Sequence, residues 1–185
     1  PFIILDQKSF EDESDTIGTD DFNGGKLAGE HLKELGHKEV VVVVPSKMTV
    51  NIQNRLKGFQ SIYSENVTVL ETSLSKEGGK KIVPRLVETK ATGIFALNDE
   101  LAFGLYYGLK ELDKKIPEDY SIIGYDNVDM CEYVSPTLTT IAQPIYELGQ
   151  QTAEMLLKRI NEPTEEWHNK KLPVNIIKRF STTHA

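Results

Sequence analysis

Short apolar runs alternate along the chain with longer segments in which apolar residues recur every three or four positions. The runs are rich in β-branched residues and predict strands at residues 40–44, 67–70, 93–97 and 120–124. The segments between them predict amphipathic helices, and their apolar faces are Leu27, Ala28, Leu32 and Leu35; Ile52, Leu56, Phe59 and Tyr63; and Leu101, Leu105, Leu109 and Leu112. A longer helix is predicted over residues 145–160. The alternation favours repeated βα units and a parallel sheet.

The segment after Leu70 has the least regular helical pattern. Ile82, Val83, Leu86 and Val87 are periodic, but Pro84 lacks a backbone N–H group. A helix with a kink or a late start is therefore expected there.

The chain opens on a further apolar run, residues 1–5, which ends at Asp6. A strand that is apolar on both faces needs neighbours on both edges, and no strand precedes this one in the sequence. We therefore expect the sequence to be the carboxyl-terminal part of a longer protein.

Polar residues follow the predicted strands at their carboxyl ends. Right-handed crossovers would place helices on both faces of the sheet and bring these ends to one edge. The residues concerned are Asp6, Ser46, Thr72, Asn98 and Asp126. They could cap helices or turns, or they could bind a ligand, because open α/β sheets bind ligands at this edge. At residues 98 and 99, the interpretation is that Asn98 reaches a ligand and Asp99 serves the following helix.

Composition and motifs narrow the class of protein. A net charge of −7 over 185 residues disfavours a nucleic-acid or membrane surface in this stretch, and no apolar run is long enough to cross a bilayer. The single cysteine, Cys131, indicates a reducing cytoplasm. Asp6 and Asp126 could form a carboxylate pair of the kind that glycosidases use. However, nucleotide-binding and hydrolase motifs are absent and the histidines lack metal-ligand spacing, so we expect no enzyme, cofactor or metal.

Several motifs in one order resemble LacI-type transcriptional repressors. They are GGKLAGEHLKELGHKEVVVV, NRLKGF, FALNDELAFGLYYGLKE, IPEDYSIIGYD, LTTIAQP and LPVNIIKRFST, and they cover nearly the whole chain. The resemblance implies an α/β, type I periplasmic-binding-protein-like fold with two lobes. Residues 20–143 and 174–185 would form a nearly complete second lobe. Residues 1–19 and 144–173 would form the remnant of a truncated first lobe.

The same resemblance implies a set of residues that bind a sugar. Asn98 would donate to one hydroxyl and accept from another, Asp126 would accept from two hydroxyls, and the planar fork of Arg55 would grip adjacent oxygens. Gln143 would act at the crossover between lobes, and Asp6 from the first lobe. Without the resemblance, Asp126 could equally cap a turn and Arg55 could be a solvated helix residue.

One stretch departs from the pattern of the family. Where many relatives place an aromatic ring against the sugar, this chain has Thr72, Ser73 and Leu74. The change favours a pentose or another small polyol over a nucleobase.

The implied function is that of the effector-binding domain of a cytoplasmic regulator. Sugar binding would close the lobes and so control operator binding by an amino-terminal headpiece that this sequence lacks. A homodimer contact is expected at Phe103, Tyr107, Tyr133 and Val134, although these residues could instead pack in the core. The alternative function is a periplasmic-type sugar-binding protein for transport, which shares the fold.

Overall fold

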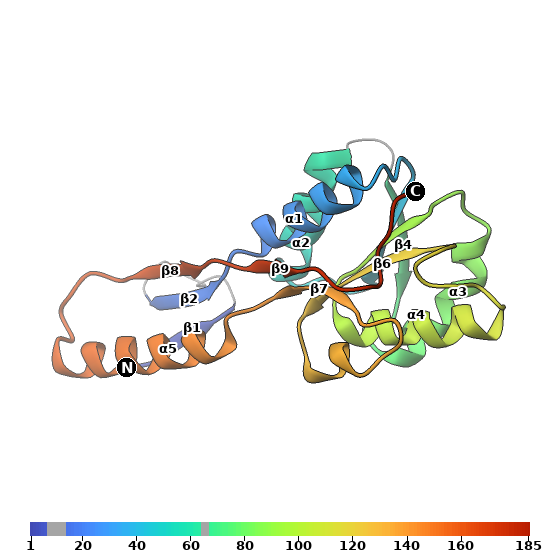
Figure 1. Cartoon of the computed structure of the whole chain (residues 1–185). Coiled ribbons are helices and arrows are strands. Elements are labelled where there is room, and N and C mark those ends of the chain that lie inside the picture. The colour runs from blue at the N-terminus through green and yellow to red at the C-terminus, as the bar shows by residue number, and fades with distance from the viewer. Residues whose placement is uncertain (7–13, 64–66) are drawn as a thin grey trace.

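The computed structural model describes residues 1–6, 14–63 and 67–185, which form two sheets with their helices (Figure 1). The larger sheet has the order β4-β3-β5-β6-β7-β9, and only its edge strand β9 runs antiparallel to its neighbour. Its strands are β3 (Val40–Pro45), β4 (Val67–Thr72), β5 (Gly93–Ala96), β6 (Ser121–Asp126), β7 (Thr139–Ala142) and β9 (Asn175–Ile177). The predicted parallel sheet is confirmed.

Helices cover both faces of this sheet. Helices α1 (Asp21–Glu34) and α2 (Val50–Tyr63) pack on one face, and α3 (Lys76–Val87) and α4 (Asp99–Glu111) pack on the other. Strand β3 shows why its sequence is apolar throughout. Val41 and Val43 face the core beneath α3 and α4, whereas Val40, Val42 and Val44 face the core beneath α1 and α2.

The smaller sheet is parallel, with the order β1-β2-β8, and lies beside the larger one (Figure 1). It contains β1 (Ile3–Leu5), β2 (Asp15–Thr19) and β8 (Asn169–Leu172), and it packs against α5 (Ile145–Asn161). Its buried core is small, namely Ile17, Leu148 and Leu172. A buried ion pair supports this core, with Arg159 Nε 2.7 Å from Asp15 Oδ2.

The chain passes between the two sheets after β2, after β7 and after β8. A short 3-10 helix, η1 (Asp129–Glu132), follows β6. The boundaries at residues 19/20, 143/144 and 173/174, which the sequence suggests for two lobes, stay a prediction.

Helix α3 departs from expectation. It begins at Lys76, where Ser75 caps it by accepting a hydrogen bond from the N–H of Gly78 at 3.1 Å, and it continues past Pro84. Of the two alternatives expected from the sequence, the late start is therefore wrong, and a kink at Pro84 stays a prediction. A proline inside a helix costs about 3 kcal/mol, but burial of Ile82, Val83 and Leu86 contributes about 1.5 to 3 kcal/mol for each side chain.

Candidate ligand-binding site

A cavity of about 350 Å³ opens at the carboxyl edge of the larger sheet and also contacts the end of β1. Four of the five predicted ligand residues line it: Asp6, Arg55, Asn98 and Asp126. The remaining lining residues are Leu5, Thr49, Asn51, Ile52 and Leu74. The cavity therefore joins residues of both sheets, and it mixes charged, amide and hydroxyl groups with apolar side chains.

Arg55 is held from three directions. Its Nε donates to Asp21 Oδ1 at 2.8 Å, its Nη1 donates to the carbonyl of Leu97 at 2.9 Å, and its guanidinium lies 3.6 Å from the ring centre of Tyr125. The residue is only 8% exposed. Within the described part of the chain Nη2 has no hydrogen-bond partner, so this nitrogen is available to a ligand in the cavity.

Asp126 ends β6 with a positive φ of 116°. Its Oδ1 accepts a hydrogen bond from Gln143 Nε2 at 2.6 Å and lies 3.7 Å from Arg55 Nη1. Burial raises the pKa of this carboxyl to about 6, although the positive charge of Arg55 acts in the opposite direction. The second oxygen, Oδ2, has no partner among the described residues and can accept from a ligand.

Gln143 lies outside the lining of the cavity and supports Asp126 from behind. Its Oε1 accepts from Thr19 Oγ1 at 3.2 Å, so the side chain connects Asp126 to the strand β2 of the smaller sheet. A direct contact between Gln143 and the ligand stays a prediction.

Asn98 has two functions in this geometry. Its Oδ1 caps α4 by accepting from the N–H of Leu101 at 2.9 Å. The residue also lines the cavity, and its amide NH2 has no partner among the described residues. Capping therefore fixes the side chain while leaving its donor group for a ligand.

The interpretation of Asp99 as a residue that serves the helix needs correction. Its carboxylate is fully buried and accepts hydrogen bonds from Thr140 Oγ1 at 2.7 Å, the N–H of Val128 at 3.0 Å and Cys131 Sγ at 3.1 Å. Asp99 thus ties the start of α4 to β7 and to the loop after β6. Asn98 is the residue that caps the helix, because its backbone is extended and its side chain turns back toward the first turn.

Asp6 and Leu74 also line the cavity. Asp6 has a φ of 52°, its Oδ1 accepts from the N–H of Thr19 at 3.2 Å, and burial raises its pKa. Leu74, in the loop after β4, places an apolar side chain where an aromatic ring was expected in relatives. The described residues that line the cavity therefore offer apolar side chains but no aromatic ring.

Sequence reasoning missed several residues of the site. Thr49, Asn51 and Ile52 lie at the start of α2, after strand β3, where the rule that ligands bind past the ends of strands could have found them. Asp21, only 4% exposed, gives no such signal, because an acidic residue in the first turn of a helix is common.

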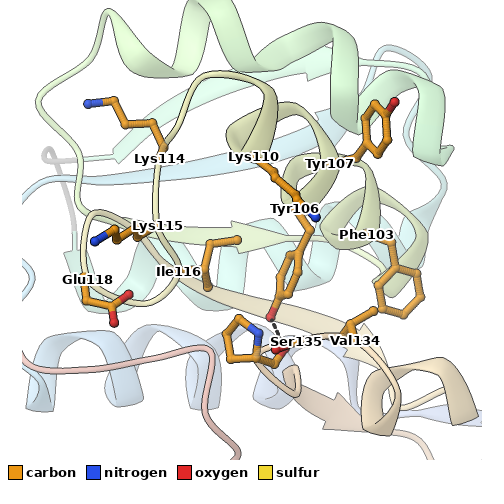
Figure 2. Close-up of a pocket in the computed structure, with 11 residues that line it drawn as sticks. Phe103, Tyr106, Tyr107, Lys110, Lys114, Lys115, Ile116, Glu118, Val134 and Ser135 are labelled. Carbon is orange, nitrogen blue, oxygen red and sulfur yellow. Dashed lines mark hydrogen bonds between the residues drawn. The ribbon is translucent and has the colours of Figure 1, made fainter.

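The four residues predicted for a dimer contact lie on or beside α4 and η1. Phe103 is buried and Val134 is half-buried, whereas Tyr107 and Tyr133 are 56% and 81% exposed. Phe103, Tyr107 and Val134 line a surface groove of about 460 Å³ together with Tyr106, Ile116 and Pro136 (Figure 2).

Two further properties concern the described residues alone. They contain no group of three or more His, Cys, Asp or Glu that could hold a metal ion. No helix formed by them is both long and apolar enough to span a bilayer.

Comparison with known families and curated proteins identifies relatives over most of the chain. The family of periplasmic binding protein-like domains matches residues 30–182. The ribose operon repressor of Haemophilus influenzae is 32% identical over 189 residues, which cover 98% of this chain and 57% of the repressor. The HTH-type transcriptional regulator DegA of Bacillus subtilis is 33% identical and covers 91% of this chain and 52% of that protein. The chain thus spans little more than half the length of these relatives.

Two solved structures agree with this result. A LacI family transcriptional regulator from Enterococcus faecalis V583, with bound ribose, is 61% identical with a TM-score of 0.97, over 100% of this chain and 69% of that one. A LacI family regulator from Enterococcus faecium, also with bound ribose, is 55% identical with a TM-score of 0.96, over 100% and 71%. These relatives are repressors or regulators of transcription. The chain therefore belongs to the LacI family of transcriptional regulators and has the α/β, periplasmic-binding-protein-like fold that the resemblance implies.

Proposed function

We propose that the chain is the effector-binding part of a regulator that responds to a small neutral sugar, with ribose as the first candidate. The observation that carries the proposal is the convergence of Arg55, Asn98 and Asp126 on one cavity, each with a polar group unoccupied by the described residues. Ribose bound to a LacI family regulator that is 61% identical supports the choice of pentose.

The polar groups of Asp126, Arg55 and Asn98 that have no partner among the described residues can form hydrogen bonds with adjacent sugar hydroxyls. The Oδ2 of Asp126 can accept from a hydroxyl, with a charge-assisted bond that is stronger than a neutral one. Arg55 Nη2 and the amide NH2 of Asn98 donate to sugar oxygens. Leu74 and Ile52 supply apolar contact with the carbon skeleton.

Lobe closure is the proposed route from sugar to DNA. Asp6 follows a strand of the smaller sheet, whereas Asp126 ends a strand of the larger one, and both line the cavity. A ligand that contacts both residues binds a closed arrangement more tightly than an open one, and so shifts the population toward closure. Operator DNA would be bound by an amino-terminal headpiece outside this sequence, and the regulator would act in the cytoplasm.

A homodimer is the proposed assembly. The groove along α4 is lined by apolar and aromatic side chains together with charged ones, and within it Tyr106 Oη donates to the carbonyl of Pro136 at 3.1 Å (Figure 2). Exposed Tyr107 and Tyr133 would add aromatic contact area at a symmetric interface. The alternative of a transport protein is disfavoured, because the relatives are regulators.

Calorimetry with the full-length protein tests the proposed ligand. Wild type should bind D-ribose, and Asp126→Ala should weaken binding by about tenfold to more than a hundredfold, since loss of a charge-assisted partner costs about 1.5 to 3 kcal/mol. The control is Glu71→Gln, a change at an exposed position of β4, which should bind as wild type. Wild-type affinity in Asp126→Ala would remove this residue from the site.

A further inference from the structure

The Arg55 guanidinium has a buried anionic partner that sugar binding alone does not require. Asp21 Oδ1 accepts hydrogen bonds from Arg55 Nε at 2.8 Å and from Tyr125 Oη at 3.1 Å. Both side chains of the ion pair are almost completely buried, with 10% of the Arg55 side chain and 4% of the Asp21 side chain exposed. The positive charge that faces the cavity is therefore compensated from behind.

The backbone holds this pair in place. Helices α1 and α2 touch through glycines, because a Cβ on Gly25 would overlap the carbonyl oxygen of Arg55 and a Cβ on Gly58 would overlap that of Phe22. Asp20 caps α1 by accepting from the N–H of Asn23 at 3.1 Å, which fixes the turn that carries Asp21. The close approach of the two helices therefore holds the backbone of Arg55 close to Asp21.

The charges around the cavity are unequal. Asp6 and Asp126 line it together with Arg55, and Asp21 lies behind Arg55, so three carboxylates surround one guanidinium. At an effective dielectric constant of about 20, a single like charge about 5 Å away weakens the binding of an anion on the order of a hundredfold. A neutral polyol does not meet this repulsion and still receives the hydrogen bonds.

We propose that Asp21 is a specificity-determining residue, which pairs with Arg55 so that the site accepts uncharged polyols and rejects sugar phosphates and other anionic sugars. The inference rests on the proposed function of sugar binding. Asp21 does not touch the ligand in this proposal; it acts by cancelling the charge of Arg55 and by fixing its orientation.

The variant Asp21→Asn isolates the charge. Asparagine has nearly the same shape, and its Oδ1 can still accept from Arg55 Nε and Tyr125 Oη, but Arg55 becomes uncompensated. A purely structural role for Asp21 predicts that the variant loses affinity for neutral and anionic sugars alike. A role in charge selectivity predicts that affinity for the anionic sugar rises in absolute terms.

The experiment is calorimetry on the full-length protein with D-ribose and D-ribose 5-phosphate at low and at high salt. We expect wild type to bind ribose 5-phosphate at least about a hundredfold more weakly than ribose. In Asp21→Asn the ratio of the two dissociation constants should narrow by about tenfold or more, whereas the control Glu71→Gln should keep the wild-type ratio.

Three results of the affinity measurements at constant salt would overturn the inference, and they are distinguishable from one another. Equal binding of both sugars by wild type, or an unchanged ratio in an Asp21→Asn protein that still binds ribose, would overturn the inference alone. A wild-type protein that binds no ribose would overturn the proposed function, and the inference with it. If Asp21→Asn does not fold, the salt series on wild type decides. Binding of ribose 5-phosphate that strengthens as salt screens repulsion supports the inference, and binding that weakens or stays constant contradicts it.

Discussion

Asp126 has a protonation equilibrium that ligand binding should disturb. Burial raises its pKa to about 6, and the neighbouring charges are Arg55, Asp99, Asp21 and, across the cavity, Asp6. Because the ionised carboxylate is the form proposed to accept a charge-assisted hydrogen bond from a sugar hydroxyl, sugar affinity should fall as the pH drops below about 6. We expect roughly tenfold weaker binding at pH 5 than at pH 7.5 by calorimetry.

Stability of the unliganded protein should respond to Asp126 in the opposite direction. A carboxyl whose pKa is raised from the usual 3.8 to about 6 binds more protons when folded than when unfolded within that window. This group therefore adds stability as the pH falls from about 6 to 3.8.

In Asp126→Asn most of the pH dependence of sugar affinity should disappear, and a full dependence in that variant would assign it to other groups such as Asp6.

Two adjacent residues, Asn98 and Asp99, should differ in their contribution to stability. Asp99→Ala removes the acceptor of Val128 N–H and of the buried Thr140 Oγ1 and Cys131 Sγ, and should lower the free energy of unfolding by about 2 to 4 kcal/mol. Asn98→Ala removes one helix cap and should cost about 1 kcal/mol. Urea denaturation of both variants measures the difference, and equal losses would contradict the anchoring role of Asp99.

These residues also mark the limit of prediction from sequence at this scale. The resemblance to the LacI family pointed to Asp6, Arg55, Asn98 and Asp126, which share one cavity because parallel strands end at one edge. The sequence interpretation assigned the helix to Asp99, whereas Asn98 caps it, because both residue types cap helices and only the backbone angles decide. The role of Asp21 could not be predicted from the sequence, because its partner Arg55 is distant along the chain. The two side chains come into contact only through the packing of α1 on α2.

At the scale of elements, the contact between α1 and α2 links the fold to the site. Gly25→Ala would place a methyl group against the carbonyl of Arg55, and overpacking of this kind typically costs about 1 to 3 kcal/mol. We expect a lower free energy of unfolding together with weaker ribose binding, because Arg55 must shift. Thermal unfolding and calorimetry measure the two effects.

Gly149→Ala provides the matched control on another helix. Gly149 lies within α5, and a Cβ there would contact nothing within 4 Å. The change should stabilise the chain by about 0.5 to 1 kcal/mol, because glycine is unfavourable inside a helix. Equal behaviour of the two variants would mean that the close approach of α1 and α2 does not position Arg55.

The accuracy of the predicted elements follows the strength of their hydrophobic pattern. Strands β3, β5 and β6, apolar on both faces, were recognised because they lie between two layers of helices. Strands β2 and β8 were missed, since β2 begins with Asp15, which forms an ion pair with Arg159 in α5, and β8 is mostly exposed. An ion pair between residues so far apart in the sequence cannot be predicted from the local hydrophobic periodicity.

At the scale of the whole molecule, helix α5 exposes several large apolar side chains. Its exposed large side chains are Ile145, Tyr146, Leu157 and Ile160. Burial of such side chains contributes about 1.5 to 3 kcal/mol each, which is enough to drive association of the 185-residue chain. The double variant Leu157→Glu/Ile160→Glu should therefore reduce the oligomer size in light scattering, and an unchanged size would place the contact elsewhere.

The surface at α4, unlike that of α5, is the proposed symmetric contact of the regulator dimer. Tyr107 packs beneath Lys80, whose Nζ lies 4.4 Å from the ring centre, and Tyr133 projects from the end of η1. Tyr107→Glu/Tyr133→Glu introduces four like charges across a two-fold interface, and we expect the full-length protein to sediment as a monomer. Its ribose affinity should match wild type, since neither tyrosine lines the ligand cavity.

The α5 double variant is the reciprocal control and should leave this dimer intact. A dimer that survives the tyrosine changes but is lost with the α5 changes would move the interface from α4 to α5.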